Sequence, residues 1–396
     1  MHTASLRQLF LQHVAQTSSA PMALEVLRAE GIYLYLADGR RFIDLVSGVS
    51  VSAVGHCHPK VVEAVKRQAE QYMHLMVYGE YVQSPQVMLA QRLAELLPQN
   101  LSSVYFVNSG SEANEGAMKL AKRYSGRTEM VAFKKAYHGS TQGVLSLMGD
   151  EHYKRNFRPL LPDVRMLEFN NVEQLQQITS CTACVLVEPI QAEAGVALPQ
   201  HDFLKRLRKR CTGVGALLIF DEVQTGVGRT GSMFAFEQFG VVPDVLTLAK
   251  AFGGGMPLGA FISSKEIMSS LTHNPALGHI TTFGGHPVSC AAALAALDVI
   301  ESERLLAQVH AKSERFKASM LLNPKVKEVR GRGLLLAVEL LDTDLLQRFF
   351  KRTLEKGLAL DWFLHCNTAF RIAPPLTITE QEVDEACRLL HKCLDS

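Results

Sequence analysis

The sequence has no apolar run near the roughly 18 residues that a membrane-spanning helix needs. It also has no excess of one charge, because 41 lysine and arginine residues stand against 39 aspartate and glutamate residues. Nucleic acid and anionic membranes attract proteins through a basic surface, which a formal net charge of +2 does not predict. We therefore expect neither of them as a partner.

The sequence also lacks a cysteine framework. Its eight cysteines are scattered, which is typical of a reducing compartment, and we expect a cytoplasmic protein. Cys181 and Cys184 form a CxxC pair, but no second pair follows at zinc-ribbon spacing. His56-Cys57-His58 is rich in metal ligands, yet a proline and a helical pattern follow it directly. We expect no metal site, with zinc at either place as the alternative.

A chain of 396 residues, 47% of them hydrophobic, can bury a large core. From about residue 104 onward, short apolar runs alternate with helical patterns. This alternation predicts an α/β fold with a mainly parallel central sheet and helices on both faces. The expected strands are Val104–Val107, Met130–Phe133, Cys184–Val187, Ala216–Phe220 and Val245–Ala249.

The pattern changes after an alanine-rich helix expected over Pro287–Ile300. Short strands expected over 325–329, 333–339 and 370–372 are mixed with helices expected over 344–356 and 381–394. This mixture predicts a smaller C-terminal α+β domain. At the other end, Met1–Thr17 has helical apolar spacing, and Asp38-Gly39 between two apolar runs predicts a hairpin.

Two of the expected buried strands end on a residue that is costly to bury. Asp221 follows one strand and Lys250 follows another, at the sheet edge where open α/β folds build their sites. A buried lysine loses its charge penalty when it forms an imine, and a buried aspartate is stable opposite a permanent cation. Pyridoxal 5′-phosphate (PLP) offers an aldehyde for Lys250 and a pyridine nitrogen for Asp221. The alternative is an ordinary buried ion pair.

Other strand ends carry residues suited to the same cofactor. Ser109-Gly110-Ser111 precedes a helix, so its N–H groups can bind a phosphate, although a plain N-cap is equally consistent. Tyr137 could stack on a flat ring or belong to the core. Gly253–Gly255 lets backbone pass close to a cofactor, or forms a flexible loop.

The order of these motifs resembles the class III (ω-amino acid) PLP-dependent aminotransferases over nearly the whole chain, from Ala29-Glu-Gly31 onward. Within this class, the motifs resemble most those of the ornithine/acetylornithine branch. The motifs are Gly55-His-Cys-His-Pro59, Asn108-Ser-Gly-Ser-Glu-Ala-Asn-Glu115, Tyr137-His-Gly139, Glu188-Pro-Ile-Gln191, Phe220-Asp-Glu-Val-Gln224, Leu248-Ala-Lys250, Thr282-Phe-Gly-Gly285 and Phe370-Arg-Ile-Ala-Pro-Pro375.

The resemblance implies the type I fold of PLP-dependent transferases. We expect residues 1–55 to form an N-terminal segment that packs with the small domain, 56–300 to form the large PLP-binding domain, and 301–396 to form the small C-terminal domain. It also implies a homodimer.

The resemblance further implies roles for residues at the cofactor. Lys250 would bond to PLP and later move the proton, while Asp221 would keep the pyridine nitrogen protonated. The other implied cofactor residues are Ser109, Gly110 and Ser111 at the phosphate, Tyr137 and Val223 on the two ring faces, Gln224 at the phenolic oxygen, His138 and Glu188 in their motifs, and Thr282 from the other subunit.

At the substrate, the resemblance implies that Arg371 clamps the α-carboxylate of glutamate or 2-oxoglutarate. Glu193 would pair with Arg371 when the donor has no carboxylate at the reacting carbon; the alternative for Glu193 is a solvated loop acid. Two positions depart from the branch. Ser140 stands where acetylornithine aminotransferases typically have arginine, and Val49 stands about where ornithine aminotransferases have a donor-binding tyrosine. Both departures concern the donor rather than the cofactor.

We therefore expect an enzyme that moves the terminal amino group of an ornithine-like ω-amino donor to 2-oxoglutarate, giving an aldehyde and glutamate. The donors considered are ornithine, N-acetylornithine, lysine-like amino acids and diamines. One alternative is another PLP reaction on the same fold, such as 4-aminobutyrate-type transamination, an aminomutase, a decarboxylase or a racemase. A non-catalytic protein is the other, but it would be expected to lose Lys250 or Asp221. The presence of both Arg371 and Glu193 favours transamination.

Overall fold

The computed structural model describes residues 5–77 and 79–395. A seven-stranded sheet in the order β4-β10-β9-β8-β7-β5-β6 forms the centre of the larger lobe. The pairs from β9 through β6 are parallel, whereas β10 runs antiparallel to both β9 and β4. The strands are β4 (Ser103–Val107), β5 (Glu129–Phe133), β6 (Val164–Leu167), β7 (Thr182–Val187), β8 (Leu217–Asp221), β9 (Val245–Leu248) and β10 (Gly259–Ser263).

Both faces of this sheet are covered by helices. In β7, Val185 and Val187 pack into the apolar cluster that includes α8 (Phe203–Val214), whereas Leu186 packs into the cluster that includes α5 (Gly110–Ser125). Successive residues of a strand point to opposite faces, so two covered faces demand a continuous apolar run. The predicted α/β fold with a mainly parallel sheet is confirmed.

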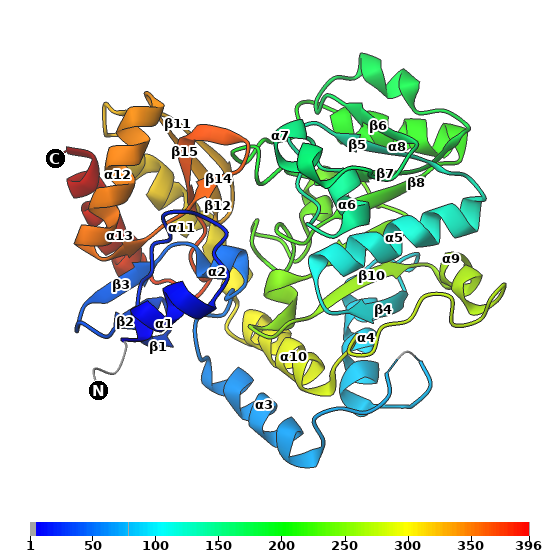
Figure 1. Ribbon diagram of the computed structural model, residues 1–396, viewed down its shortest axis with the longest axis horizontal. Coiled ribbons are helices and arrows are strands. Elements are labelled where there is room, and N and C mark those ends of the chain that lie inside the picture. The colour runs from blue at the N-terminus through cyan, green and yellow to red at the C-terminus, as the bar shows by residue number, and fades with distance from the viewer. Residues whose placement is uncertain (1–4, 78, 396) are drawn as a thin grey trace.

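Three more helices cover one edge of the larger lobe (Figure 1). They are α3 (Pro59–Gln71), α4 (Ser84–Leu96) and α10 (Pro287–Ser302), and α10 packs on both α3 and α4. Short helical segments in the loops of this lobe are α6 (Gln142–Ser146), α7 (Glu151–Lys154) and α9 (Lys265–Ser269).

The smaller lobe lies beside the first (Figure 1) and contains the predicted C-terminal α+β domain. Its antiparallel sheet has the order β11-β12-β15-β14. These strands are β11 (Val326–Arg332), β12 (Leu335–Leu340), β14 (Trp362–Phe363) and β15 (Cys366–Ile372). The helices α11 (Leu305–Met320) and α12 (Thr343–Lys356) pack on this sheet, and α13 (Glu380–Asp395) packs on both of these helices.

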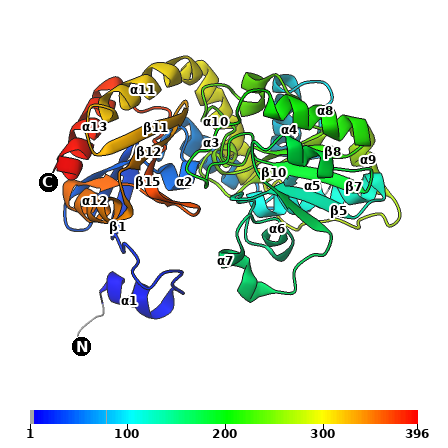
Figure 2. The same ribbon diagram turned by 90° about the horizontal axis from the view of Figure 1, so that it is seen from above.

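A third sheet joins the beginning of the chain to its end. The strands β1 (Val26–Glu30), β2 (Tyr33–Leu36) and β3 (Arg41–Asp44) form an antiparallel ribbon, and β13 (Leu358–Ala359) pairs with β3 in parallel. Before it, α1 (Leu6–His13) has no buried residue and projects away from the body (Figure 2). Part of the helix expected over Met1–Thr17, residues 1–4, lies outside the described residues. Within the described part of the chain, no helix is long and apolar enough to cross a bilayer.

The two lobes are tied together by a buried cation. Arg229, in a loop of the larger lobe, is 0% exposed, and its Nη1 donates to the carbonyl oxygens of Leu334 and Pro374. Burial lowers the pKa of Arg229 to about 10. A buried guanidinium that lost these acceptors would be left uncompensated, so the contact holds the lobes in one arrangement.

Candidate active site

A cavity of about 400 Å³ lies at the carboxyl ends of the parallel strands. Asp221 ends β8, and Lys250 lies two residues beyond the end of β9, so the topology brings both side chains to one edge. All of the predicted cofactor residues except Thr282 line this cavity. They are Ser109, Gly110, Ser111, Tyr137, His138, Glu188, Asp221, Val223, Gln224 and Lys250.

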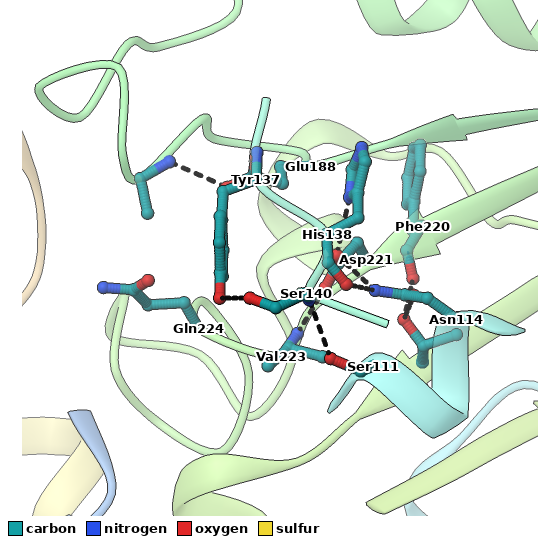
Figure 3. A network of polar contacts seen from close by, with 12 residues as sticks. Ser111, Asn114, Tyr137, His138, Ser140, Glu188, Phe220, Asp221, Val223 and Gln224 are labelled. Carbon is teal, nitrogen blue, oxygen red and sulfur yellow. Dashed lines mark hydrogen bonds and ion pairs between the residues drawn. The ribbon is translucent and has the colours of Figure 1, made fainter. Parts of the chain in front are cut away.

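The Asp221 carboxylate is held by three donors (Figure 3). Its Oδ2 accepts from Nδ1 of His138 at 2.7 Å and from Nδ2 of Asn114 at 2.8 Å, and its Oδ1 accepts from the backbone N–H of Val223 at 3.0 Å. The side chain is buried, with 3% of its residue surface exposed. These donors fix the orientation of the Asp221 carboxylate at the cavity, where it can face a cation.

Asn114 is itself fixed from two sides. Its Nδ2 also donates to the backbone oxygen of His138 at 2.8 Å, and its Oδ1 accepts from Oγ1 of Thr247, in β9, at 2.8 Å. Asn114 comes from α5 and His138 from the loop after β5, so one amide links three elements to Asp221. Neither Asn114 nor Thr247 was assigned a role from the sequence, although Asn114 lies inside one of the motifs quoted there.

Among the described residues, Lys250 forms no ion pair with a carboxylate. Its Nζ donates to Oε1 of Gln224 at 3.0 Å, and no ion pair within residues 5–77 and 79–395 joins Lys250 to Asp221. Burial lowers the pKa of Lys250 below its ordinary value. A buried amine with a lowered pKa is a nucleophile rather than half of a salt bridge, so the geometry favours bonding to an aldehyde over the ion-pair alternative.

The loop at the start of α5 packs closely against two neighbouring loops. Ser109 caps the helix by accepting from Glu112 N–H at 3.2 Å. A Cβ on Gly110 would lie 2.8 Å from Val223, and one on Gly139, whose φ is +132°, would lie 2.2 Å from Oγ of Ser111. These glycines let three loops converge where the helix N-terminus favours an anion. The cap at Ser109 is therefore compatible with the predicted phosphate site at Gly110 and Ser111.

Tyr137 is fixed at both ends. Its backbone N–H donates to Oε1 of Glu188 at 3.1 Å, and its Oη lies 3.0 Å from Oγ of Ser140. Glu188 also accepts from the N–H of Ala192 at 2.9 Å, and burial raises the pKa of Glu188 to about 7. Figure 3 shows the Tyr137 ring between Glu188 and Ser140. These contacts set the position of the ring, while Ser140 remains exposed.

The predicted substrate residues Arg371 and Glu193 form a buried pair. Nη2 of Arg371 donates to Oε1 of Glu193 at 2.6 Å, and the guanidinium lies 4.7 Å from the ring centroid of Phe363. Neither side chain lines the cavity, but the charges of both act on Lys250. A second acid, Asp361, lies 3.6 Å from Nη1 of Arg371; sequence reasoning did not identify it.

Five of the predicted residues do not line the cavity of this chain, namely Arg371, Glu193, Ser140, Val49 and Thr282. Val49 is 37% exposed and sits in a left-handed turn in which residues 47–50 have φ between 54° and 64°. This turn brings Val51, rather than Val49, to the cavity. Thr282 is exposed and does not line the cavity. In residues 5–77 and 79–395, no cluster of three or more His, Cys, Asp or Glu is placed to hold a metal ion.

A lysine, an oriented aspartate and a helix N-terminus at one cavity are typical of PLP-binding transferases of fold type I. The chain belongs to the aminotransferase class-III family, whose model matches residues 14–394. The family and its PLP dependence, predicted from the sequence, are thereby confirmed, and the protein is a PLP-dependent transaminase. When bound, PLP supplies an electron sink beside the amine-bearing carbon, and the cavity residues named above fit it.

The chain is similar to proteins of known structure and to curated relatives. It is 41% identical to the acetylornithine aminotransferase of Methanocaldococcus jannaschii, over 91% of this chain and 90% of that protein. The ornithine aminotransferase structure from Toxoplasma gondii has a TM-score of 0.90 at 30% identity, covering 97% of this chain and 92% of that one. A transaminase structure from the marine bacterium Virgibacillus has a TM-score of 0.93 at 27% identity, covering 99% and 98%.

Proposed function

We propose that the enzyme moves the terminal amino group of an ornithine-like ω-amino donor to 2-oxoglutarate, giving an aldehyde and glutamate. The observation that carries this proposal is the buried Arg371–Glu193 pair, with its 2.6 Å hydrogen bond, beside Lys250. A site that must accept two unlike substrates needs a cation for the α-carboxylate of one and a neutral surface for the other. Glu193 supplies that neutralisation when no carboxylate is present.

The chain's own residues have defined tasks in this proposal. Nζ of Lys250 takes the proton from the amine-bearing carbon and returns it, which its lowered pKa favours. Asp221 holds the cationic ring nitrogen, and Tyr137 and Val223 hold the two faces of the ring. Thr282 is proposed to act in the cavity of the other subunit of a homodimer, which its exposure in one chain permits. A cytoplasmic location is supported by eight free cysteines.

Ser140 bears on the choice of donor. The relatives named acetylornithine aminotransferase support a donor of the ornithine type. Ser140 offers a neutral hydroxyl, already within 3.0 Å of Tyr137 Oη, where that branch typically offers a guanidinium. Replacing the guanidinium by a hydroxyl weakens the binding free energy of a donor carboxylate by roughly 1.5–3 kcal/mol, which lowers its affinity by about ten- to a hundredfold. We therefore place free ornithine first, then lysine-like ω-amino acids and diamines, with N-acetylornithine not preferred.

A single-turnover panel of amino donors tests this ranking. Each donor is mixed with the PLP-loaded enzyme without an acceptor, and conversion of the pyridoxal form to the pyridoxamine form is followed by absorbance. Ornithine should react fastest, and Ser140→Arg should speed N-acetylornithine by about ten- to a hundredfold. Ser18→Arg, an exposed serine-to-arginine change in the N-terminal segment, serves as the control. The ranking is wrong if N-acetylornithine matches every free ω-amine and Ser140→Arg brings no gain.

A further inference from the structure

Arg371 lies between two carboxylates rather than one. Oε1 of Glu193 accepts from its Nη2 at 2.6 Å, and Oδ2 of Asp361 lies 3.6 Å from its Nη1. The Arg371 side chain is 1% exposed, and the side chains of Glu193 and Asp361 are 9% and 20% exposed. One buried acid, Glu193, and one partly exposed acid, Asp361, therefore face a single guanidinium before any substrate arrives.

The two acids differ in how they are attached. Asp361 directly precedes β14, and its backbone oxygen accepts from the N–H of Arg371 at 3.1 Å. The pairing of β14 with β15 therefore fixes the backbone of Asp361 next to that of Arg371. Glu193 comes from the loop after β7 in the larger lobe and is held by Arg371 and by Leu364 N–H at 3.2 Å. If the Glu193 side chain rotates away from Arg371, the strand pairing still keeps Asp361 next to Arg371.

The surroundings of Asp361 bring its pKa closer to neutral pH. Burial raises the pKa of Asp361 to about 6, and the charged groups that face it are Arg371, Glu193, Lys250 and Asp44. Its Oδ1 is buried and has no hydrogen-bond partner in the described part of the chain, so this oxygen can carry a proton without breaking a contact. A substrate carboxylate at Arg371 would add a negative charge to a site that already holds Glu193 and Asp361, and it would raise the cost of leaving Asp361 ionised.

We infer that Asp361 is a specificity-determining residue that takes up one proton when a substrate carboxylate binds to Arg371. This inference rests on the proposed role of Arg371. Above the pKa of Asp361, the affinity of Arg371 for a carboxylate falls by up to about tenfold per pH unit, because protonation must accompany binding. An ω-amine without a carboxylate at its reacting carbon binds without this protonation, so its affinity does not fall in the same way. Near neutral pH, Asp361 thus biases the site toward such amines.

Isothermal titration of the PLP-loaded enzyme with glutarate tests this step. Glutarate has two carboxylates but no amine or keto group, so it binds without reacting. Titrations at pH 7.5 in two buffers of different ionisation enthalpy measure the protons taken up per glutarate bound. Wild type should take up most of one proton, and Asp361→Asn should take up close to none. Asp344→Asn, which removes an exposed acid from the same lobe, should behave like wild type.

The dissociation constant gives a second measure. For wild type it should rise between pH 6 and 8, whereas Asp361→Asn should stay nearly flat and bind glutarate about tenfold more tightly at pH 8. Proton uptake that persists in Asp361→Asn overturns the inference while leaving the proposed function intact, provided that Arg371→Ala loses glutarate binding. If wild type binds no glutarate, or Arg371→Ala binds it equally well, the proposed function fails and the inference fails with it.

Discussion

Nδ1 of His138 lies 2.7 Å from Oδ2 of Asp221, and both side chains are buried. This pair, together with Asn114, aims an anion into the cavity that Lys250 also lines. The arrangement requires the ends of three elements to converge. Because these contacts all orient Asp221, we expect a substitution that removes its charge to have a large effect.

Asp221→Asn should keep the shape of this side chain and remove its charge. Without the anion, the pyridine nitrogen loses its cationic form, and an electrostatic contribution of several kcal/mol disappears. The half-reaction with glutamate should slow by several powers of ten. Stopped-flow absorbance of the PLP-loaded variant checks this. A loss of less than about tenfold would assign Asp221 a structural role instead.

Lys250→Ala should abolish the covalent attachment of PLP and all turnover while leaving the fold intact. The reason is that Lys250 lines the cavity and its Nζ has one hydrogen bond, to Gln224, so its loss enlarges the cavity rather than leaving an unpaired charge. Mass spectrometry after borohydride reduction measures the attachment. Lys265→Ala, an exposed change at the start of α9, should retain a reducible adduct. An adduct that survives in Lys250→Ala contradicts the assignment.

Glu222→Gln should alter the pH dependence of stability. Burial raises the pKa of Glu222 to about 8 from its ordinary 4.5, so the folded state holds a proton that the unfolded chain releases. Its contribution to stability is full below about pH 4.5 and is lost as pH rises through 8. Glutamine cannot titrate, so the wild-type melting temperature relative to the variant should fall from pH 5 to pH 8. Calorimetry that shows a constant difference would contradict the raised pKa.

Thr282→Ala should weaken PLP binding only if two chains share each site. Thr282 is exposed and outside the cavity of its own chain, so a cofactor effect requires delivery from a partner. Dialysis equilibrium with PLP should show several-fold weaker retention, and sedimentation should show a dimer. Thr272→Ala, in the same connecting region, is the control. An active monomer at assay concentration would refute the shared site.

The sheet core and the strand-end residues could be predicted because their signal is local. A fully buried parallel strand is a short apolar run, and the residue that ends it is read directly from the sequence, as with Asp221 and Lys250. In contrast, β10 and β6 were not predicted. The first follows a glycine run and Pro257, which indicate a loop, and the second carries Arg165 on an edge.

The residues around the substrate were harder to predict because they depend on non-local geometry. Asp361 is placed beside Arg371 only because β14 pairs with β15. The strand β14 has two residues, which is too short to give a periodic pattern in the sequence. Val51 reaches the cavity because residues 47–50 form a left-handed turn. Gly48 alone hints at such a turn, since β-branched residues such as Val49 rarely adopt positive φ.

The most direct test of the account is the effect of Arg371→Ala on the two half-reactions, measured separately by single-turnover absorbance. Arg371 should serve 2-oxoglutarate and glutamate but not a donor without a carboxylate. We expect Arg371→Ala to raise the 2-oxoglutarate concentration needed for half-maximal rate by about a hundredfold or more, while a diamine donor reacts within about threefold of wild type. Equal losses in both half-reactions, or an unchanged requirement for 2-oxoglutarate, would contradict the alternation of Arg371 and Glu193 on which the proposed function depends.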